Sequence, residues 1–131
     1  GMDDIPISAG TNIGDEKPAA RMGYLEMNAS SSMSSFGKKD WKRRYMKIDT
    51  RTGEICIYNS QEDTTCIHII KCMNIQTAES YSKRGGDRKR FNVTTINDET
   101  YKFQCGTAAE GDEWVKSLND WKDYALMNMS F

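Results

Sequence analysis

The segment TAAEGDEWVKSLNDWKDYALM, residues 107–127, has the period of an amphipathic helix. It opens with Thr107 and Glu110 at the spacing of a capping box, in which two side chains satisfy the first free backbone amides of a helix. Apolar residues then recur every three or four positions and line one helical face: Trp114, Leu118, Trp121 and Ala125. The segment therefore predicts a C-terminal helix that must bury this face against other elements.

The residues before this helix favour strands separated by turns. We expect seven short strands, over residues 22–27, 41–48, 54–59, 65–70, 75–81, 88–95 and 100–105. Two of the intervening turns are DTRTG at 49–53, which ends in glycine, and INDE at 96–99. Short strands at this spacing usually pair with their chain neighbours, so they predict an antiparallel sandwich or barrel.

The length of 131 residues suits one domain. Residues 1–20 lack periodicity and predict a flexible leader, residues 21–127 the domain, and residues 128–131 a short tail. Neither a secretory signal nor an apolar run of about 20 residues is visible, so we expect a cytoplasmic protein. The four cysteines form no C-x-x-C pair and favour reduced thiols, although counting alone leaves two disulfides open.

The formal net charge of −1 hides a segregation of charge along the chain. Residues 38–47 contain six lysines and arginines and one acid, and residues 83–90 contain five and one. If these two basic segments meet in space, the protein has one positive pole, which would orient it against an anionic surface.

Four motifs in chain order resemble the pleckstrin homology (PH) domain family. They are GYLEM at 23–27, WKRRYMKI at 41–48, EICIY at 54–58 and EGDEWVKSL at 110–118, and the resemblance covers about residues 21–127. It implies a mainly β fold: a barrel of seven antiparallel strands in two nearly orthogonal sheets, capped by one C-terminal helix. Trp114 stands at the family's most characteristic position, where its role is structural.

The resemblance also implies a non-catalytic module that binds phosphoinositide headgroups near the loop between the first two strands. Lys42-x-Arg44-x-Met46 is similar to the family's second-strand motif, with Lys38 and Lys39 as additional cations. The strand period places Lys42 and Arg44 on the side of Met46, toward the mouth of the barrel. Two positions depart from the motif, because Met27 and Ile57 stand where strong headgroup binders usually carry a lysine and a tyrosine.

A second lipid site is implied on the outer side of the same loop. Some PH domains bind lipid there, between the strand 1–2 and strand 5–6 loops. Its candidates in this chain are Trp41, Arg43, Lys83, Arg84, Arg88 and Lys89. Both sites predict peripheral association with anionic membranes.

Other functions remain as alternatives. A PH-like barrel can instead be an adaptor that binds a protein partner, with only weak, general attraction to anionic lipids, and the basic run can simply solvate a strand. Nucleic acid is not expected as a partner, since the sequence pI is near 5.9. The single histidine, His68, has no partners at metal-ligand spacing, and we expect no catalytic residue, metal or cofactor.

Overall fold

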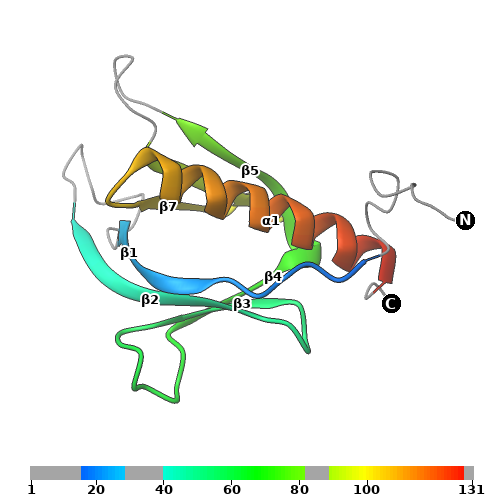
Figure 1. Ribbon diagram of the computed structural model, residues 1–131, viewed down its shortest axis with the longest axis horizontal. Helices are drawn as coiled ribbons and strands as arrows, with labels where there is room; N and C mark the ends of the chain where they lie inside the picture. Colours follow the sequence, from blue (N-terminus) through cyan, green and yellow to red (C-terminus); the bar gives the residue numbers. More distant parts are fainter. Residues whose placement is uncertain (1–15, 29–39, 82–88, 129–131) are drawn as a thin grey trace, which may run out of the picture.

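The computed structural model describes residues 16–28, 40–81 and 89–128 (Figure 1). The elements in chain order are β1 (Met22–Asn28), β2 (Trp41–Asp49), β3 (Glu54–Tyr58), β4 (His68–Lys71), the 3-10 turn η2 (Cys72–Asn74), β5 (Ile75–Tyr81), β6 (Arg90–Thr95), β7 (Thr100–Gln104) and α1 (Ala108–Asn128). The seven predicted strands and the predicted C-terminal helix are confirmed, with shifts of a few residues at some ends.

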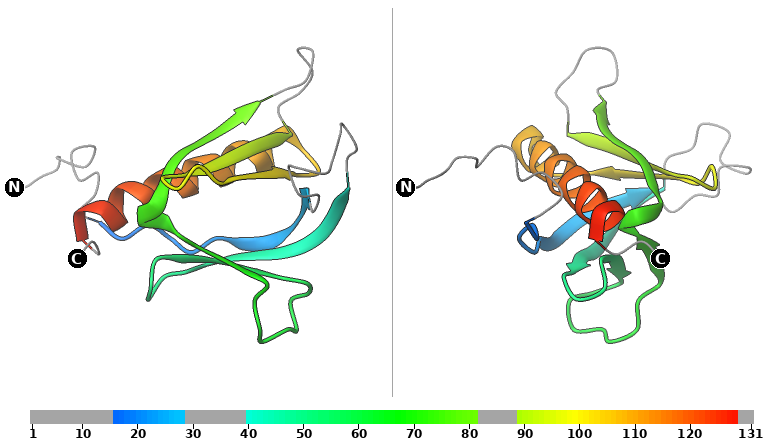
Figure 2. Two further views of the ribbon diagram at one scale, coloured as in Figure 1. Left: turned by 180° about the vertical axis from the view of Figure 1, so that it is seen from behind. Right: turned by 90° about the vertical axis from the view of Figure 1, so that its right-hand side faces the viewer.

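The seven strands form one continuous antiparallel sheet in the order β4-β3-β2-β1-β7-β6-β5. The β1–β7 ladder is short, because it contains only the pairs Glu26 with Gln104 and Met27 with Phe103. We call the β1–β7 pairing the seam. At the seam the sheet folds so that its two halves form facing layers, which Figure 2 shows from behind. The two sheets expected from the sequence are therefore the two halves of one continuous sheet, joined by the short β1–β7 pairing.

Helix α1 closes the side of the barrel between the two layers, where it packs on η2, β5 and β6. Its buried residues are Gly111 and the four that the period predicted: Trp114, Leu118, Trp121 and Ala125. Trp114 is only 4% exposed within the core, which supports its structural role. The backbone N–H of Glu110 donates to Oγ1 of Thr107 at 3.1 Å, so Thr107 caps the helix as its spacing predicts.

Both predicted turns have a residue in the left-handed region. Gly53 has φ 70°, and its N–H donates to the Asp49 carbonyl at 2.8 Å, which closes the β2–β3 hairpin. Asp98 has φ 67° in the turn between β6 and β7.

The fourth strand begins later than residues 65–70 predicted. Residues 59–67 instead form a loop that packs beside β1 and β3. Within it, the Gln61 N–H donates to the Tyr24 hydroxyl at 2.8 Å, and the Ile67 N–H donates to the Ile57 carbonyl at 2.6 Å. These contacts hold the loop in place, and regular pairing with β3 starts at His68.

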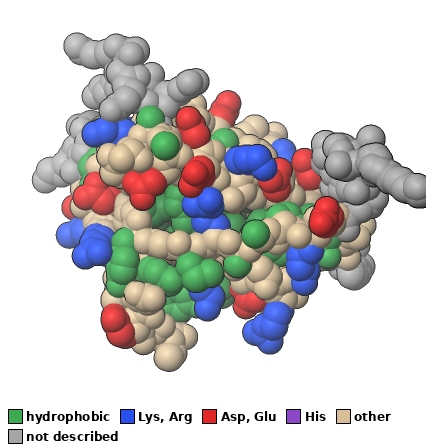
Figure 3. Space-filling model, in the orientation of Figure 1, with side chains coloured by type: hydrophobic (Ala, Val, Ile, Leu, Met, Phe, Trp, Pro, Cys, Tyr) green, Lys and Arg blue, Asp and Glu red, His purple; other side chains and the backbone are tan. Residues whose placement is uncertain are grey.

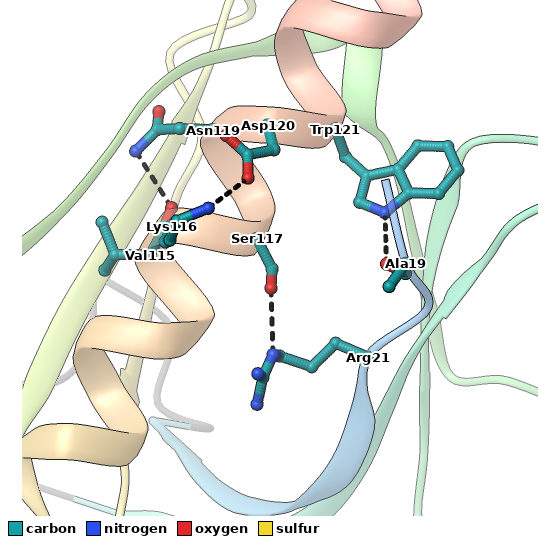
Figure 4. Close-up of polar contacts among 8 residues, drawn as sticks. All are labelled: Ala19, Arg21, Val115, Lys116, Ser117, Asn119, Asp120 and Trp121. Carbon is teal, nitrogen blue, oxygen red and sulfur yellow. Dashed lines mark hydrogen bonds and ion pairs between the residues drawn. The ribbon is translucent and has the colours of Figure 1, made fainter. Parts of the chain in front are cut away.

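Residues 18–21 lie along α1, although the sequence predicts a flexible leader up to residue 20 (Figure 4). The indole N–H of Trp121 donates to the Ala19 carbonyl at 3.0 Å. The guanidinium of Arg21 donates through Nε to Ser117 Oγ at 2.9 Å and lies 3.3 Å from a carboxylate oxygen of Glu113. This stretch is therefore fixed to the helix, whereas residues 1–15 and 129–131 lie outside the described residues.

The four cysteines are free thiols, and Cys56, Cys72 and Cys105 are buried. Burial raises the pKa of Cys72 to about 12 and that of Cys105 to about 11, so both remain protonated at neutral pH. In the described part of the chain, no helix combines the length and the apolar character needed to cross a bilayer.

Candidate functional site

Strand β2 presents its cations on two opposite faces. Lys42 and Arg44 share the inner face with Met46 and Ile48, which are fully buried further along the strand. We call Lys42 and Arg44 the mouth pair. The ammonium of Lys42 lies 3.7 Å from an Asp40 carboxylate oxygen, and Nη1 of Arg44 donates to the Arg43 carbonyl at 3.1 Å.

The inner face next to the mouth pair is apolar. Met27 pairs with Lys42 across β1 and β2 and is only 5% exposed, and Ile57 on β3 is fully buried. The two positions that depart from the headgroup motif are thus filled by core side chains. The mouth pair has no further cation from β1 or β3 at these positions, which limits how many phosphate contacts it can offer.

The outer face carries a row of four polar side chains across four strands. Glu26 pairs with Arg43 on β2 and with Gln104 on β7, and Gln104 pairs with Arg90 on β6. We call these four residues the outer row. Since directly paired residues in an antiparallel sheet point to the same side, the four side chains are neighbours on one surface.

Hydrogen bonds connect three members of the outer row. Nε of Arg90 donates to Oε1 of Gln104 at 2.9 Å, and Nε2 of Gln104 donates to Oε1 of Glu26. The glutamine thus links a cation on β6 to an acid on β1 and bridges the short seam of the sheet.

Each arginine of the outer row lies over an aromatic ring. The guanidinium carbon of Arg43 is 4.0 Å from the ring centre of Tyr24, and that of Arg90 is 5.1 Å from the ring of Trp41. A guanidinium stacked face-on keeps its N–H edge available for an anion, and the stacking restricts its rotamers. The contact of Arg90 with Trp41 also joins the two basic segments of the sequence.

The tyrosines of β1, β2 and β3 support this surface. The ring centres of Tyr24 and Tyr45 are 5.1 Å apart, and those of Tyr45 and Tyr58 are 6.5 Å apart. Tyr45 faces outward, yet it is only 8% exposed because it packs between the other two rings. The ring beneath Arg43 therefore belongs to a fixed cross-strand cluster.

Not every predicted site residue can be placed. Trp41 and Arg43 lie on the outer face and Lys42 and Arg44 on the inner face, as the strand period predicts. Lys89 is exposed and immediately precedes β6. The remaining candidates, Lys38, Lys39, Lys83, Arg84 and Arg88, lie outside the described residues.

Sequence reasoning missed Arg90, Gln104 and Glu26 as members of a site. Arg90 is part of the second basic segment, but nothing in the sequence shows that β6 lies two strands away from β1. The signal that could have found them is the topology of the barrel, which sets Gln104 beside Glu26 across 78 positions of chain.

Other features of the described residues are weaker candidates. A cavity of about 370 Å³ lies between residues 18–21 and α1, but its two cations, Arg21 and Lys116, are matched by Glu113 and Asp120. Acidic and basic side chains are likewise interspersed on this face in Figure 3. His68 is exposed, with its ring 5.9 Å from that of Tyr101, and no group of three potential metal ligands occurs in the described ranges.

The chain forms a small antiparallel barrel closed by a C-terminal helix, with two arginines over aromatic rings near the starts of β2 and β6. The sequence profile of the PH domain family matches residues 20–122, and the chain belongs to that family. PH domains are generally non-catalytic binding modules. No curated protein sequence matches the chain significantly.

Solved PH domains share the fold at low sequence identity. The PH domain of human oxysterol binding protein-related protein 11 aligns with a TM-score of 0.71 and 15% identity, over 90% of this chain and 91% of that one. The N-terminal PH domain of human ARAP2 gives a TM-score of 0.61 and 23% identity over 86% and 87%. The C-terminal PH domain of pleckstrin, solved with D-myo-Ins(1,2,3,4,5)P5, gives 0.60 and 18% over 76% and 93%.

Proposed function

We propose that this PH domain attaches a protein to the cytoplasmic surface of membranes by binding phosphoinositide headgroups at the outer row. The observation that carries the proposal is the contact between Arg90 and Trp41, because it unites the two basic segments on one surface. Such a surface attracts an anionic leaflet, and each lysine or arginine near it contributes about 1 kcal/mol. No catalytic step is part of this function.

The outer row is a better candidate than the mouth pair for two reasons. Its arginines lie over aromatic rings, which restricts their rotamers, and their terminal Nη groups can engage a phosphate, although Nε of Arg90 already donates to Gln104. The mouth pair lies beside the buried Met27, and its Lys42 already has the Asp40 carboxylate nearby. Lys89, together with Lys83, Arg84 and Arg88, would add charge to the outer site, as Lys38 and Lys39 would to the mouth pair.

Inositol phosphate chemistry has precedent on this fold. The C-terminal PH domain of pleckstrin has been solved with two different inositol pentakisphosphates. At 18% identity to this chain, that structure supports only a shared fold, so the headgroup specificity of the present chain has to be measured.

Two adjacent arginines of β2 provide a matched test. Arg43→Ala and Arg44→Ala remove the same charge one residue apart, from the outer and the inner face respectively. In vesicle sedimentation, Arg43→Ala should weaken phosphoinositide binding about 30-fold or more, through lost charge and lost hydrogen bonds. Arg44→Ala should weaken it only about fivefold, the general contribution of one cation.

The outcomes separate the competing interpretations. Equal losses for the two variants would mean general attraction without a site, and a larger loss for Arg44→Ala would assign the site to the mouth pair. Binding that distinguishes bisphosphate isomers of equal charge would indicate a specific pocket. No binding to any anionic vesicle would refute the proposal.

One observation favours protein binding as a second candidate function. Ile69 in the edge strand β4 is 54% exposed, and Ile67, immediately before that strand, is 39% exposed. An edge with apolar side chains can accept a strand from another protein. Ile69→Lys should abolish binding of such a partner and leave vesicle binding unchanged.

A further inference from the structure

The outer row contains an acid between its two arginines. Glu26 has Arg43 on one side and Gln104, followed by Arg90, on the other. Strands β1 and β7 separate the two strands that carry the arginines, but the side chain of Arg90 reaches back to the ring of Trp41 on β2. An anion that contacts both arginines therefore lies close to the carboxylate of Glu26, which is paired with Arg43 and bonded to Gln104.

The charge of Glu26 is not cancelled by an ion pair with either arginine. Its carboxylate accepts from the neutral amide of Gln104, while Arg43 is stacked on Tyr24 and Arg90 on Trp41. Glu26 is partly exposed, so its negative charge acts on whatever binds above the row. The four side chains together carry a net charge of only +1.

We propose that Glu26 is a specificity-determining residue that limits the charge of the headgroup accepted at the outer row. The inference rests on the proposed function of this surface. A phosphoinositide with one phosphate on the inositol ring gains from the two arginines and brings only that one ring phosphate near the carboxylate. Each further phosphate adds −1.5 to −2 charges, so the repulsion between the headgroup and the Glu26 carboxylate grows with the number of phosphates. Repulsion weakens binding about threefold per unit charge at roughly 7 Å in water.

The test removes the charge of Glu26 and keeps its shape. Glu26→Gln retains an oxygen that can accept from Gln104, and Glu26→Thr is a second neutral variant suited to a strand. Glu54→Gln is the matched control, because it makes the same charge change at the opposite end of the same sheet layer. Binding is measured with phosphatidylcholine vesicles that contain a fixed fraction of either a phosphatidylinositol monophosphate or a bisphosphate.

Glu26→Gln should raise affinity for bisphosphate vesicles about three- to tenfold more than affinity for monophosphate vesicles, and this shift should shrink in high salt. Glu54→Gln should leave the ratio between the two lipids unchanged. An equal gain on both lipids, or no gain, overturns the inference even if the wild-type protein binds vesicles normally. Absence of wild-type binding to every anionic vesicle would instead refute the proposed function. Thermal unfolding of each variant shows that the fold is retained.

Discussion

The hydrogen-bonded chain from Arg90 through Gln104 to Glu26 should stabilise the barrel where its ladder is shortest. Gln104→Met removes both bonds and keeps an unbranched side chain of similar length. Each bond has one ionised partner, and such bonds contribute about 1.5–3 kcal/mol when buried. All three residues are partly exposed and water replaces some of this energy, so we expect a total loss of about 1.5–3 kcal/mol in the free energy of unfolding.

Urea denaturation at neutral pH measures this loss. Lys102→Met is the matched control, since Lys102 lies on the same face of β7, two residues away, and does not pair with β1. The control should change the free energy of unfolding by less than about 0.5 kcal/mol, as surface substitutions usually do. If the free energies of unfolding of the two variants agree within that margin, the hydrogen bonds of the outer row do not stabilise the β1–β7 pairing.

Three further outcomes are expected. Thr107→Ala should lower the free energy of unfolding by about 1 kcal/mol, because it removes the oxygen that caps α1, and an unchanged urea midpoint would contradict this. The backbone N–H of Arg51 bonds Asp49 and lowers the pKa of that carboxyl from its usual 3.8, so the ionised form stabilises the fold above that pH. The stability gap between the wild-type protein and Asp49→Asn should therefore close as the pH falls through the lowered pKa, and a gap that does not vary with pH would refute the assignment. A thiol reagent should modify the partly exposed Cys66 first and Cys72 only after unfolding, as mass spectrometry of the native protein can test; similar rates would show that Cys72 is accessible.

The fold could be predicted because its local signals agree with one another. The period of the α1 residues identified the buried face before any contact was known, and the glycine of DTRTG marked the β2–β3 hairpin. The start of β4 could not be predicted from the sequence, because Gln61 and Ile67 are held by contacts with Tyr24 and Ile57 that depend on the tertiary structure.

The candidate site could be predicted only in part. Alternation along β2 correctly assigned Arg43 and Arg44 to opposite faces, since this property belongs to a single strand. The outer row depends instead on the pairing of β1 with β7, which no local pattern encodes. For the same reason the acid between the two arginines could not be anticipated, although each residue was visible in the sequence.

The bond between Trp121 and Ala19 brings the beginning of the described domain next to its C-terminal helix. It ties the beginning of the domain to the last turns of α1, at the end of the barrel away from the start of β2 (Figure 1). Ile48, near that end, is seven residues from Trp41 along β2, a distance of roughly 23 Å. A domain fused to either end of this one would therefore be attached at the end of the barrel away from the start of β2, and it would leave the outer row uncovered.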